Sequence, residues 1–287
     1  MSAPAAVLCL LINALVWGVS WWPFRELKGL GLHPLWSTAI IYSFALAGVI
    51  AWWPKALMQF LRTPSLYWIA LGAGLTNACF NWAITIGDVV RLILLFYLMP
   101  IWAVLLARIV LKEPITRGAV VRIAMALMGA FIVLKPESGA IALPTSMADW
   151  LAMAGGAAFA LNNVCLRREA AQPESARAVA MFFGGAALAT VLGLILATSN
   201  VVPWPPSPRV DWIAGAAILS VLFLVANLSL QIGATSLPAN VTAVVMLTEI
   251  LFASASAVLL GAEVLQLKTL IGGSLIVGAA LLATFWR

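Results

Sequence analysis

Hydrophobic residues fill the chain in long, nearly unbroken segments that short polar stretches separate. The hydrocarbon core of a bilayer is about 30 Å thick, and roughly 20 helical residues cross it. Segments of this kind predict transmembrane helices. We expect ten of them, at about residues 5–22, 34–53, 66–87, 89–109, 118–134, 148–166, 178–198, 211–232, 240–260 and 268–286.

The same pattern argues against strands that cross the membrane. Such strands alternate apolar and polar residues over segments of about ten residues. The segments here are continuously apolar and rich in Leu, Ala and Gly. The predicted fold class is therefore an all-α membrane protein.

Composition agrees with a chain that lies almost entirely within the bilayer. Of the 287 residues, 64% are hydrophobic and 9% are charged, and the mean hydropathy is +1.07. Soluble domains carry about 25% charged residues. Ten spans take up about 200 positions, so we expect no sizeable domain outside the membrane.

The net charge of +6 comes from Lys and Arg residues in loops beside apolar segments. Basic residues in such places orient a membrane protein and do not indicate a nucleic-acid partner. When the loops are assigned to alternate sides, ten basic residues fall on one side and six on the other. The positive-inside rule then places both termini in the cytoplasm.

Cysteine and histidine are too few and too scattered for a disulfide framework or a metal site. Cys9, Cys79 and Cys165 all lie within apolar segments, and His33 is the only histidine. Structural disulfides and metal sites need paired or clustered ligands. We expect neither, and no cofactor.

The chain shows signs of an internal duplication. NWAITIG, from Asn81 to Gly87, aligns with NLSLQIG, from Asn227 to Gly233, and the segment 111–113 aligns with 261–263 at an offset of 150. Segment 17–25 aligns with 159–167 in the same order. We therefore divide the chain into a first five-helix repeat (1–134), a linker (135–147) and a second repeat (148–287).

Five spans per repeat is an odd number, so the second repeat must enter the membrane from the opposite face. Inverted repeats of this kind underlie many alternating-access transporters, which bind their solute near the midplane between the repeats. The duplication therefore predicts a secondary transporter.

Two stretches resemble a known family. PIWAVLLARIVLKE, from Pro100 to Glu113, and the stretch from Gly261 to Gly278 resemble the drug/metabolite transporter superfamily, EamA type. The resemblance implies export or exchange of small metabolites through a central cavity lined mainly by the first four spans of each repeat. In its tryptophan-rich first half the chain is most similar to bacterial inner-membrane exporters of aromatic amino acids. One departure is that Ile250 replaces the proline that would mark a hinge in the ninth span.

Glu249 is the only acidic residue deep within a predicted span. Placing an acid at the centre of a bilayer costs about 2.5 to 3.5 kcal/mol on insertion scales, so the side chain should face the protein interior. We expect Glu249 either to bind a substrate ammonium group or to exchange a proton during transport. A buried carboxyl that only bonds a neighbouring helix is the alternative.

Amide side chains form a second group of candidates. Asn77 and Asn81 are four residues apart and share one face of the third span, as Asn227 and Gln231 do in the eighth. Amides bond both carboxylate and ammonium groups, which suits a zwitterionic solute. Asn162 and Asn163 in the sixth span are further candidates. Hydrogen bonding between helices explains the first four residues equally well, and helix packing is the favoured explanation for Asn162 and Asn163.

Aromatic side chains away from the span ends form a third group. Trp17, Tyr42, Trp82 and Tyr97 lie deeper than the interfacial tryptophans, where a flat ring can pack against an aromatic or bulky solute. Contacts with lipid or with other helices are the alternative for each of them.

Other classes of protein fit less well. The chain has no G-x-x-x-x-G-K-[ST] loop for ATP hydrolysis, and neither G-x-S-x-G nor H-E-x-x-H, so we do not expect an enzyme. A receptor that does not transport gives no reason for an inverted duplication.

Substrate identity is predicted from the charges that lie deep in the spans. Lys and Arg are absent from mid-span, which favours a neutral or zwitterionic solute over an anion. The predicted substrates are aromatic and other amino acids, with protons as a candidate coupling ion; another metabolite or a drug is the alternative. We expect a monomer or a weak homodimer in the bacterial inner membrane.

Overall fold

The computed structural model describes residues 2–87, 89–134, 144–260 and 266–285. These residues form helices joined by short connections, with no strand among them. The predicted all-α fold class is confirmed. The first half below means the described residues before 135, and the second half those after 143, so most of the predicted linker lies outside the description.

Two of the helical elements are not α-helices. These two are the 3₁₀ turn η1 (Pro64–Leu66) and the π-helical turn η2 (Ala107–Leu111). The α-helices are α1 (Ala3–Val19), α2 (Trp21–Gly29), α3 (Pro34–Trp52), α4 (Lys55–Arg62), α5 (Tyr67–Ile86), α6 (Val89–Phe96), α7 (Met99–Leu106), α8 (Arg117–Leu134), α9 (Met147–Arg168), α10 (Glu174–Thr198), α11 (Val210–Ser236), α12 (Ala239–Met246), α13 (Glu249–Leu259) and α14 (Leu267–Phe285).

Several helical segments are long and apolar enough to cross a membrane. Among the described residues there are seven, some of them combining consecutive helices: Ala3–Gly29, Pro34–Trp52, Arg91–Leu111, Arg117–Leu134, Glu174–Thr198, Val210–Ser236 and Ala239–Leu259. The chain is therefore a multi-pass membrane protein. Helices α5, α9 and α14 lie where the remaining three spans are predicted, and a total of ten spans stays a prediction.

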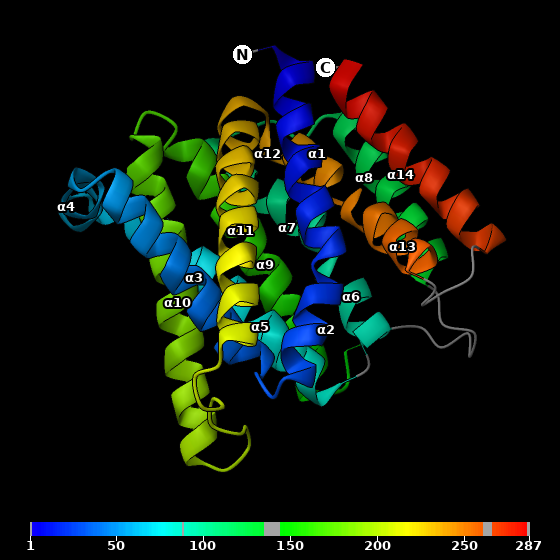
Figure 1. The fold of residues 1–287 in the computed structure, drawn as a ribbon. Helices are drawn as coiled ribbons and strands as arrows, with labels where there is room; N and C mark the ends of the chain where they lie inside the picture. Colours follow the sequence, from blue (N-terminus) through cyan, green and yellow to red (C-terminus); the bar gives the residue numbers. More distant parts are fainter. Residues whose placement is uncertain (1, 88, 135–143, 261–265, 286–287) are drawn as a thin grey trace.

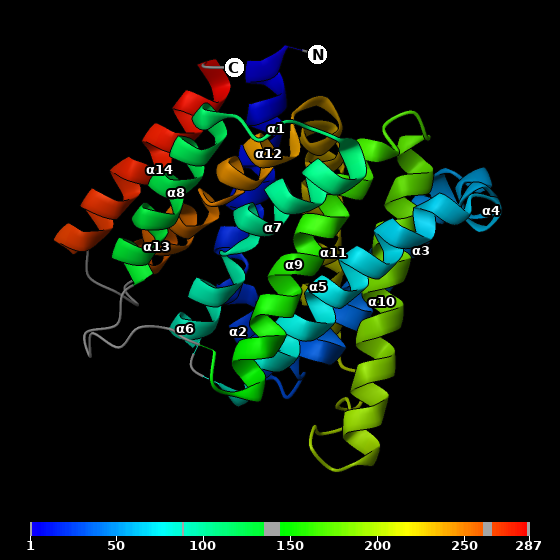
Figure 2. The same ribbon diagram turned by 180° about the vertical axis from the view of Figure 1, so that it is seen from behind.

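Figure 1 and Figure 2 show the arrangement of these helices. Helices α8 and α14 pack side by side at one edge of the bundle, and α3, α4 and α10 form the opposite edge. Between them, α5 packs along α9 and α1 packs along α11. The beginning of α1 and the end of α14 lie at the same end of the bundle, which we call the terminus end; the other end is the distal end.

Two spans are interrupted at matching places. Helix α6 ends at Phe96 and α7 begins at Met99, while α12 ends at Met246 and α13 begins at Glu249. The starts of α6 and α12, the two breaks and the restarts all differ by 150 positions, the offset found in the sequence. The two halves therefore share one backbone plan in this span.

Glycines bring a neighbouring helix close to each break. A Cβ atom on Gly156 of α9 would overlap the carbonyl oxygen of Phe96, and a Cβ on Gly18 of α1 would lie 2.7 Å from the carbonyl oxygen of Glu249. Ordinary side chains do not permit such approaches. Small residues thus allow helix backbones to meet at both breaks.

Side-chain caps fix the beginnings of two helices. The Nδ1 atom of His33 accepts a hydrogen bond of 3.3 Å from the Leu35 N–H at the start of α3. Burial, and to a lesser degree the charge of Lys28, lowers the pKa of His33, which favours the neutral ring that can accept this bond. Ser146 and Asp149 form a reciprocal capping box at the start of α9.

Candidate substrate site

Tyr97 and Glu249 join the two broken helices. Tyr97 lies in the break between α6 and α7 and is 5% exposed, and Glu249 is the first residue of α13 and is partly buried. The phenol of Tyr97 hydrogen-bonds the Glu249 carboxyl group. The N-terminus of α13 also favours a negative charge at this position, because its backbone N–H groups point toward it.

The sequence predicted Glu249 to lie in the middle of a continuous span. In the structure Glu249 still lies in the middle of the segment Ala239–Leu259, but it directly follows two residues that are not part of a regular helix. Non-helical backbone at membrane depth occurs where it is buried in protein or lines a cavity. Interrupted spans in corresponding positions of two repeats are also where transporters bind their solutes.

A second polar cluster joins three helices. Tyr42 of α3 hydrogen-bonds both Asn77 of α5 and Asn227 of α11. The amide nitrogens of Asn77 and Asn227 each donate to a carbonyl of their own helix, at 2.8 and 2.7 Å. All three side chains are at least 92% buried. The predicted candidates Tyr42, Asn77 and Asn227 therefore form one network.

Aromatic rings lie beside this network. The Phe223 ring lies 4.4 Å from Trp17, 6.0 Å from Phe24 and 6.2 Å from Tyr42, measured between ring centroids. Tyr42 also packs 5.5 Å from Phe182. Trp17 therefore packs against Phe223 of α11, and its contact with a solute stays a prediction. Phe223 and Phe24 were missed because nothing in the sequence separates them from ordinary core phenylalanines.

Asn81 and Trp82 of α5 are two further candidates, and both are only partly buried. The Asn81 amide donates a hydrogen bond to the hydroxyl of Thr38. Trp82 is partly buried and packs against the main hydrophobic core. Asn81 therefore bonds α3 at Thr38 and not at Tyr42.

The two asparagines on α9 are both buried, and the amide oxygen of each lacks a hydrogen-bond partner among the described residues. The backbone of Asn162 lies so close to Gly72 of α5 that no Cβ fits between them. Asn163 is 1% exposed, and neither atom of its amide group has a hydrogen-bond partner among the described residues. A buried amide without partners is costly unless water or a solute satisfies it, so Asn163 remains a candidate for solute contact.

Gln231 has a structural partner. Its Oε1 accepts a 3.2 Å hydrogen bond from Arg177 of α10, which also donates to the carbonyl groups of Glu169, Ala170 and Gln172 at the end of α9. The structure therefore places Gln231 in the tie between α9, α10 and α11. It does not join the polar cluster of Asn227.

A pocket of about 300 Å³ lies elsewhere, lined by Trp53, Glu174, Ser175 and Leu228. None of these residues was predicted to bind substrate. Among the described residues, no group of three or more His, Cys, Asp or Glu side chains is placed to hold a metal ion.

The spacing of Asp88 and Arg91 in the sequence, three residues apart, favours a surface pair between them, and Asp88 lies outside the described residues. In the structure Arg91 pairs with Asp149 of α9, 58 positions away. The sequence carries one signal for the role of Asp149. It stands three residues after Ser146 and opens an apolar run, which is the spacing of a capping box.

Comparison with known proteins agrees with this fold. Residues 4–135 match the model of the EamA-like transporter family. This part of the chain is therefore similar to that family, and the predicted resemblance to the drug/metabolite transporter superfamily is confirmed. The match indicates a membrane transporter of the drug/metabolite kind, a family whose members are transporters and not enzymes.

Structural comparison extends the likeness to the whole chain. A solved crystal structure is similar over 98% of this chain and 96% of its own chain, with a TM-score of 0.77 and 21% sequence identity. At that identity the likeness shows the fold alone. A search of curated proteins found no match.

Proposed function

We propose that the chain is a secondary transporter that exports small neutral or zwitterionic metabolites, above all aromatic and other amino acids, by alternating access. The observation that carries this proposal is the meeting of two broken helices at the Tyr97–Glu249 bond. Transporters of inverted-repeat architecture bind solutes at such breaks.

Three features support two inverted repeats of five spans. The breaks and helix starts of α6 and α12 share the offset of 150. A glycine on the first helix of one half approaches the break of the other half in both directions, Gly18 to Glu249 and Gly156 to Phe96. The two ends of the described chain lie at the same end of the bundle (Figure 1), which ten spans require.

The polar groups fit a zwitterion. In this proposal Glu249 either binds the substrate ammonium group or exchanges a proton during transport. The phenol of Tyr97 holds the Glu249 carboxyl group in place. The amides of Asn77, Asn227 and Asn163 meet the remaining polar atoms of the solute. Trp17 and Tyr42 pack against an aromatic side chain.

The proposed setting is the bacterial inner membrane, with both termini in the cytoplasm and the protein as a monomer or weak homodimer. The excess of basic residues on one side supports that orientation. Cysteine labelling from each side of sealed vesicles tests it directly.

Counterflow in proteoliposomes tests the function. Vesicles loaded with one amino acid should take up the same labelled amino acid with saturation, and phenylalanine, tyrosine and tryptophan should compete. Glu249→Gln should lower the rate and flatten its dependence on pH, whereas Glu26→Gln, at an exposed position on α2, should change neither. Binding without flux would indicate a receptor, and flux without competition by aromatic amino acids would indicate a different solute.

A further inference from the structure

Two of the ion pairs join the two halves of the molecule. Among the described residues there are four ion pairs, and two of them are local, Arg168 with Glu169 and Arg209 with Asp211. The other two connect the first half to the two ends of α9. They are Arg91–Asp149, which we call the distal latch, and Glu113–Arg167, which we call the proximal latch.

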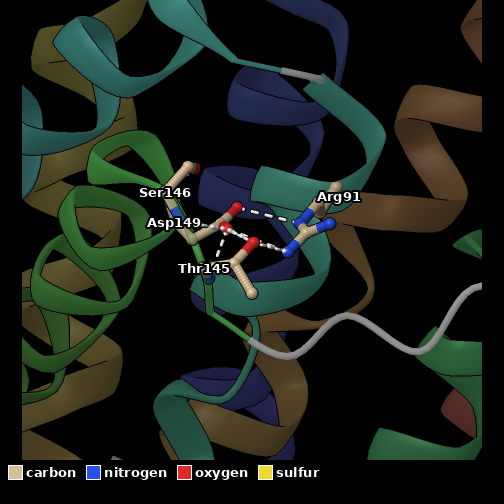
Figure 3. Close-up of polar contacts among 4 residues, drawn as sticks. All are labelled: Arg91, Thr145, Ser146 and Asp149. Carbon is tan, nitrogen blue, oxygen red and sulfur yellow. Dashed lines mark hydrogen bonds and ion pairs between the residues drawn. The ribbon is translucent and has the colours of Figure 1, made fainter.

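The distal latch is a two-point ion pair. The Nε and Nη2 atoms of Arg91 lie 2.9 Å from the two carboxylate oxygens of Asp149 (Figure 3). Nη2 also donates to the hydroxyl of Thr145 at 3.0 Å. Paired contacts of this geometry are among the stronger hydrogen bonds in proteins. The latch holds the beginning of α6 against the beginning of α9 at the distal end.

Asp149 remains satisfied when Arg91 leaves. The backbone N–H groups of Thr145 and Ser146 each donate to its carboxylate at 2.9 Å, independently of Arg91. The Asp149 side chain is 2% exposed, but that of Arg91 is 31% exposed and reaches water. Breaking a buried pair is costly when it leaves a bare charge. Here each partner keeps hydrogen bonds or gains water, so the latch is suited to open and close.

A small apolar cluster lies against the same helices. Leu92 and Leu95 of α6 pack with Ala83 of α5 and with Ala148 and Ala152 of α9, apart from the main core. Leu92 follows Arg91 directly, and Ala148 precedes Asp149. The ion pair and the apolar cluster together close the distal end of the contact between α6 and α9.

The proximal latch repeats this plan at the terminus end. Oε1 of Glu113 lies 3.7 Å from Nε of Arg167, and Oε2 accepts a 3.3 Å bond from the Ala239 N–H. Arg167 also donates to the carbonyl of Thr235. Each partner again has a second bond that survives the loss of the pair.

A separate apolar cluster accompanies the proximal latch as well. It consists of Ala107 of η2, Val164 of α9 and Ala239 of α12, each at most 2% exposed. Val164 lies one turn before Arg167 along α9. Each end of α9 therefore carries one ion pair between the halves and one apolar cluster next to it.

We propose that the two latches are the gates of the transport cycle, and that they open in alternation. When the distal latch breaks, water reaches the apolar cluster at that end while the proximal latch stays closed, and the reverse holds for the opposite state. The inference rests on the proposed alternating-access function, and it assigns the gating to named side chains of α6, α9 and the segment after η2.

Reporter cysteines test the alternation. In a background with Cys9, Cys79 and Cys165 replaced by Ala, Ala152→Cys reports on the distal cluster and Ala107→Cys on the proximal one. Both positions are at most 2% exposed. Labelling by a small, water-soluble thiol reagent is measured in purified protein without substrate, so it does not depend on the identity of the solute.

Neutralising the distal latch with Arg91→Gln and Asp149→Asn should raise labelling of the Ala152→Cys reporter several-fold and lower that of the Ala107→Cys reporter. Neutralising the proximal latch with Glu113→Gln and Arg167→Gln should do the reverse. Arg91→Lys, which keeps the charge but loses the two-point contact, should give a smaller change in the same direction as the neutral distal pair. Arg209→Gln with Asp211→Asn, a local pair, is the matched control and should leave both reporters unchanged.

A merely structural role predicts a different pattern. If both reporters become more accessible together, or if neither changes relative to the Arg209 control, the gate proposal is overturned. Failure of the proposed function would appear separately, as wild-type vesicles that show no counterflow while the reporters still respond in opposite directions.

Discussion

The two broken helices have nearly the same backbone and very different chemistry. In each, an eight-residue helix is followed by two residues that interrupt it and by a second helix. The Leu98 N–H donates to the carbonyl of Leu95, and the Thr248 N–H donates to that of Val245, again 150 positions on. Backbone geometry is therefore shared by two segments with little sequence in common.

Proline is not what breaks the second helix. Pro100 lacks the N–H that a helix needs, but Ile250 has one and donates it to Leu247 at 3.1 Å, one residue short of the α-helical partner. The lack of a proline in the ninth span led us to expect no proline hinge there, and the helix is nevertheless interrupted. Contact with a glycine of the opposite half is the feature that both breaks share.

The chemistry differs at the residue that restarts each helix. At offset 150, Met99 of the first half corresponds to Glu249 of the second. One break thus contributes a thioether and the neighbouring phenol of Tyr97, and the other contributes a carboxyl group. A site between such unlike surfaces is polar on one side, which suits a solute with one charged and one apolar part.

The largest effect should come from filling the space at the breaks. Gly156→Ala places a methyl group against the carbonyl of Phe96, and Gly18→Ala places one against that of Glu249. We expect each to destabilise the fold by about 1 to 3 kcal/mol, as overpacking does. Gly48→Ala on α3, where the added atom meets nothing within 4 Å, is the control. Thermal unfolding in detergent measures all three, and equal stability of the three variants would contradict the shared role of these contacts.

The next effect concerns the charged side of the comparison. Glu249→Gln removes the carboxyl group that binds an ammonium group when it is ionised, and hydrogen bonds to charged groups contribute about 1.5 to 3 kcal/mol. We therefore expect counterflow of amino acids to fall roughly ten-fold or more. Gln keeps the size of the side chain, so stability should change little. An unchanged rate would show that the carboxyl group only links helices.

Tyr97→Phe should have a smaller effect in the same direction. It removes one hydrogen bond, worth about 0.5 to 1.5 kcal/mol, and leaves the ring. We expect the rate to fall about two- to ten-fold. The loss in the double variant with Glu249→Gln should be smaller than the sum of the two single losses, because Gln accepts the phenol's hydrogen bond more weakly than a carboxylate does. Additive losses in this double-mutant cycle would mean that Tyr97 and Glu249 act independently.

The smallest effect should come from making the two breaks more alike. Ile250→Pro puts the first-half residue into the second half, at the second position of α13, where helices tolerate proline. We expect a loss of stability of about 1 kcal/mol or less, from the single bond to Leu247. Ala257→Pro, in the interior of α13, should cost about 3 kcal/mol or more. If both variants lose the same stability, the start of α13 tolerates proline no better than its interior does, and the prediction is wrong.

Most of the helical framework follows from hydrophobic length, but its details do not. The first predicted span, 5–22, corresponds to a helical segment that continues to Gly29, because α2 follows α1 after a single residue. The fourth and ninth predicted spans are continuous in hydropathy. Pro100 is a local signal for the break in the fourth span, but no local pattern marks the break in the ninth. Their breaks depend on packing between the halves, which hydropathy does not measure.

The candidate site shows the same division. Glu249, Tyr97, Tyr42, Asn77 and Asn227 stand out by residue type and depth in the sequence. Gln231 looks equivalent to Asn227 in spacing, yet it bonds Arg177 instead of the central cluster. Helical periodicity gives the face of a residue on its own helix, and only the neighbouring helices decide what that face meets.

The sequence by itself determined that this chain is a helical membrane protein, roughly where its helices lie and which rare polar groups they carry, because the free energy of placing each segment in lipid depends on its own composition. Tertiary structure alone decided that the ninth span breaks without a proline, that the phenol of Tyr97 meets the Glu249 carboxyl group, and that Arg91 and Glu113 reach opposite ends of α9. Each of these depends on contacts between residues more than fifty positions apart, which no local pattern encodes.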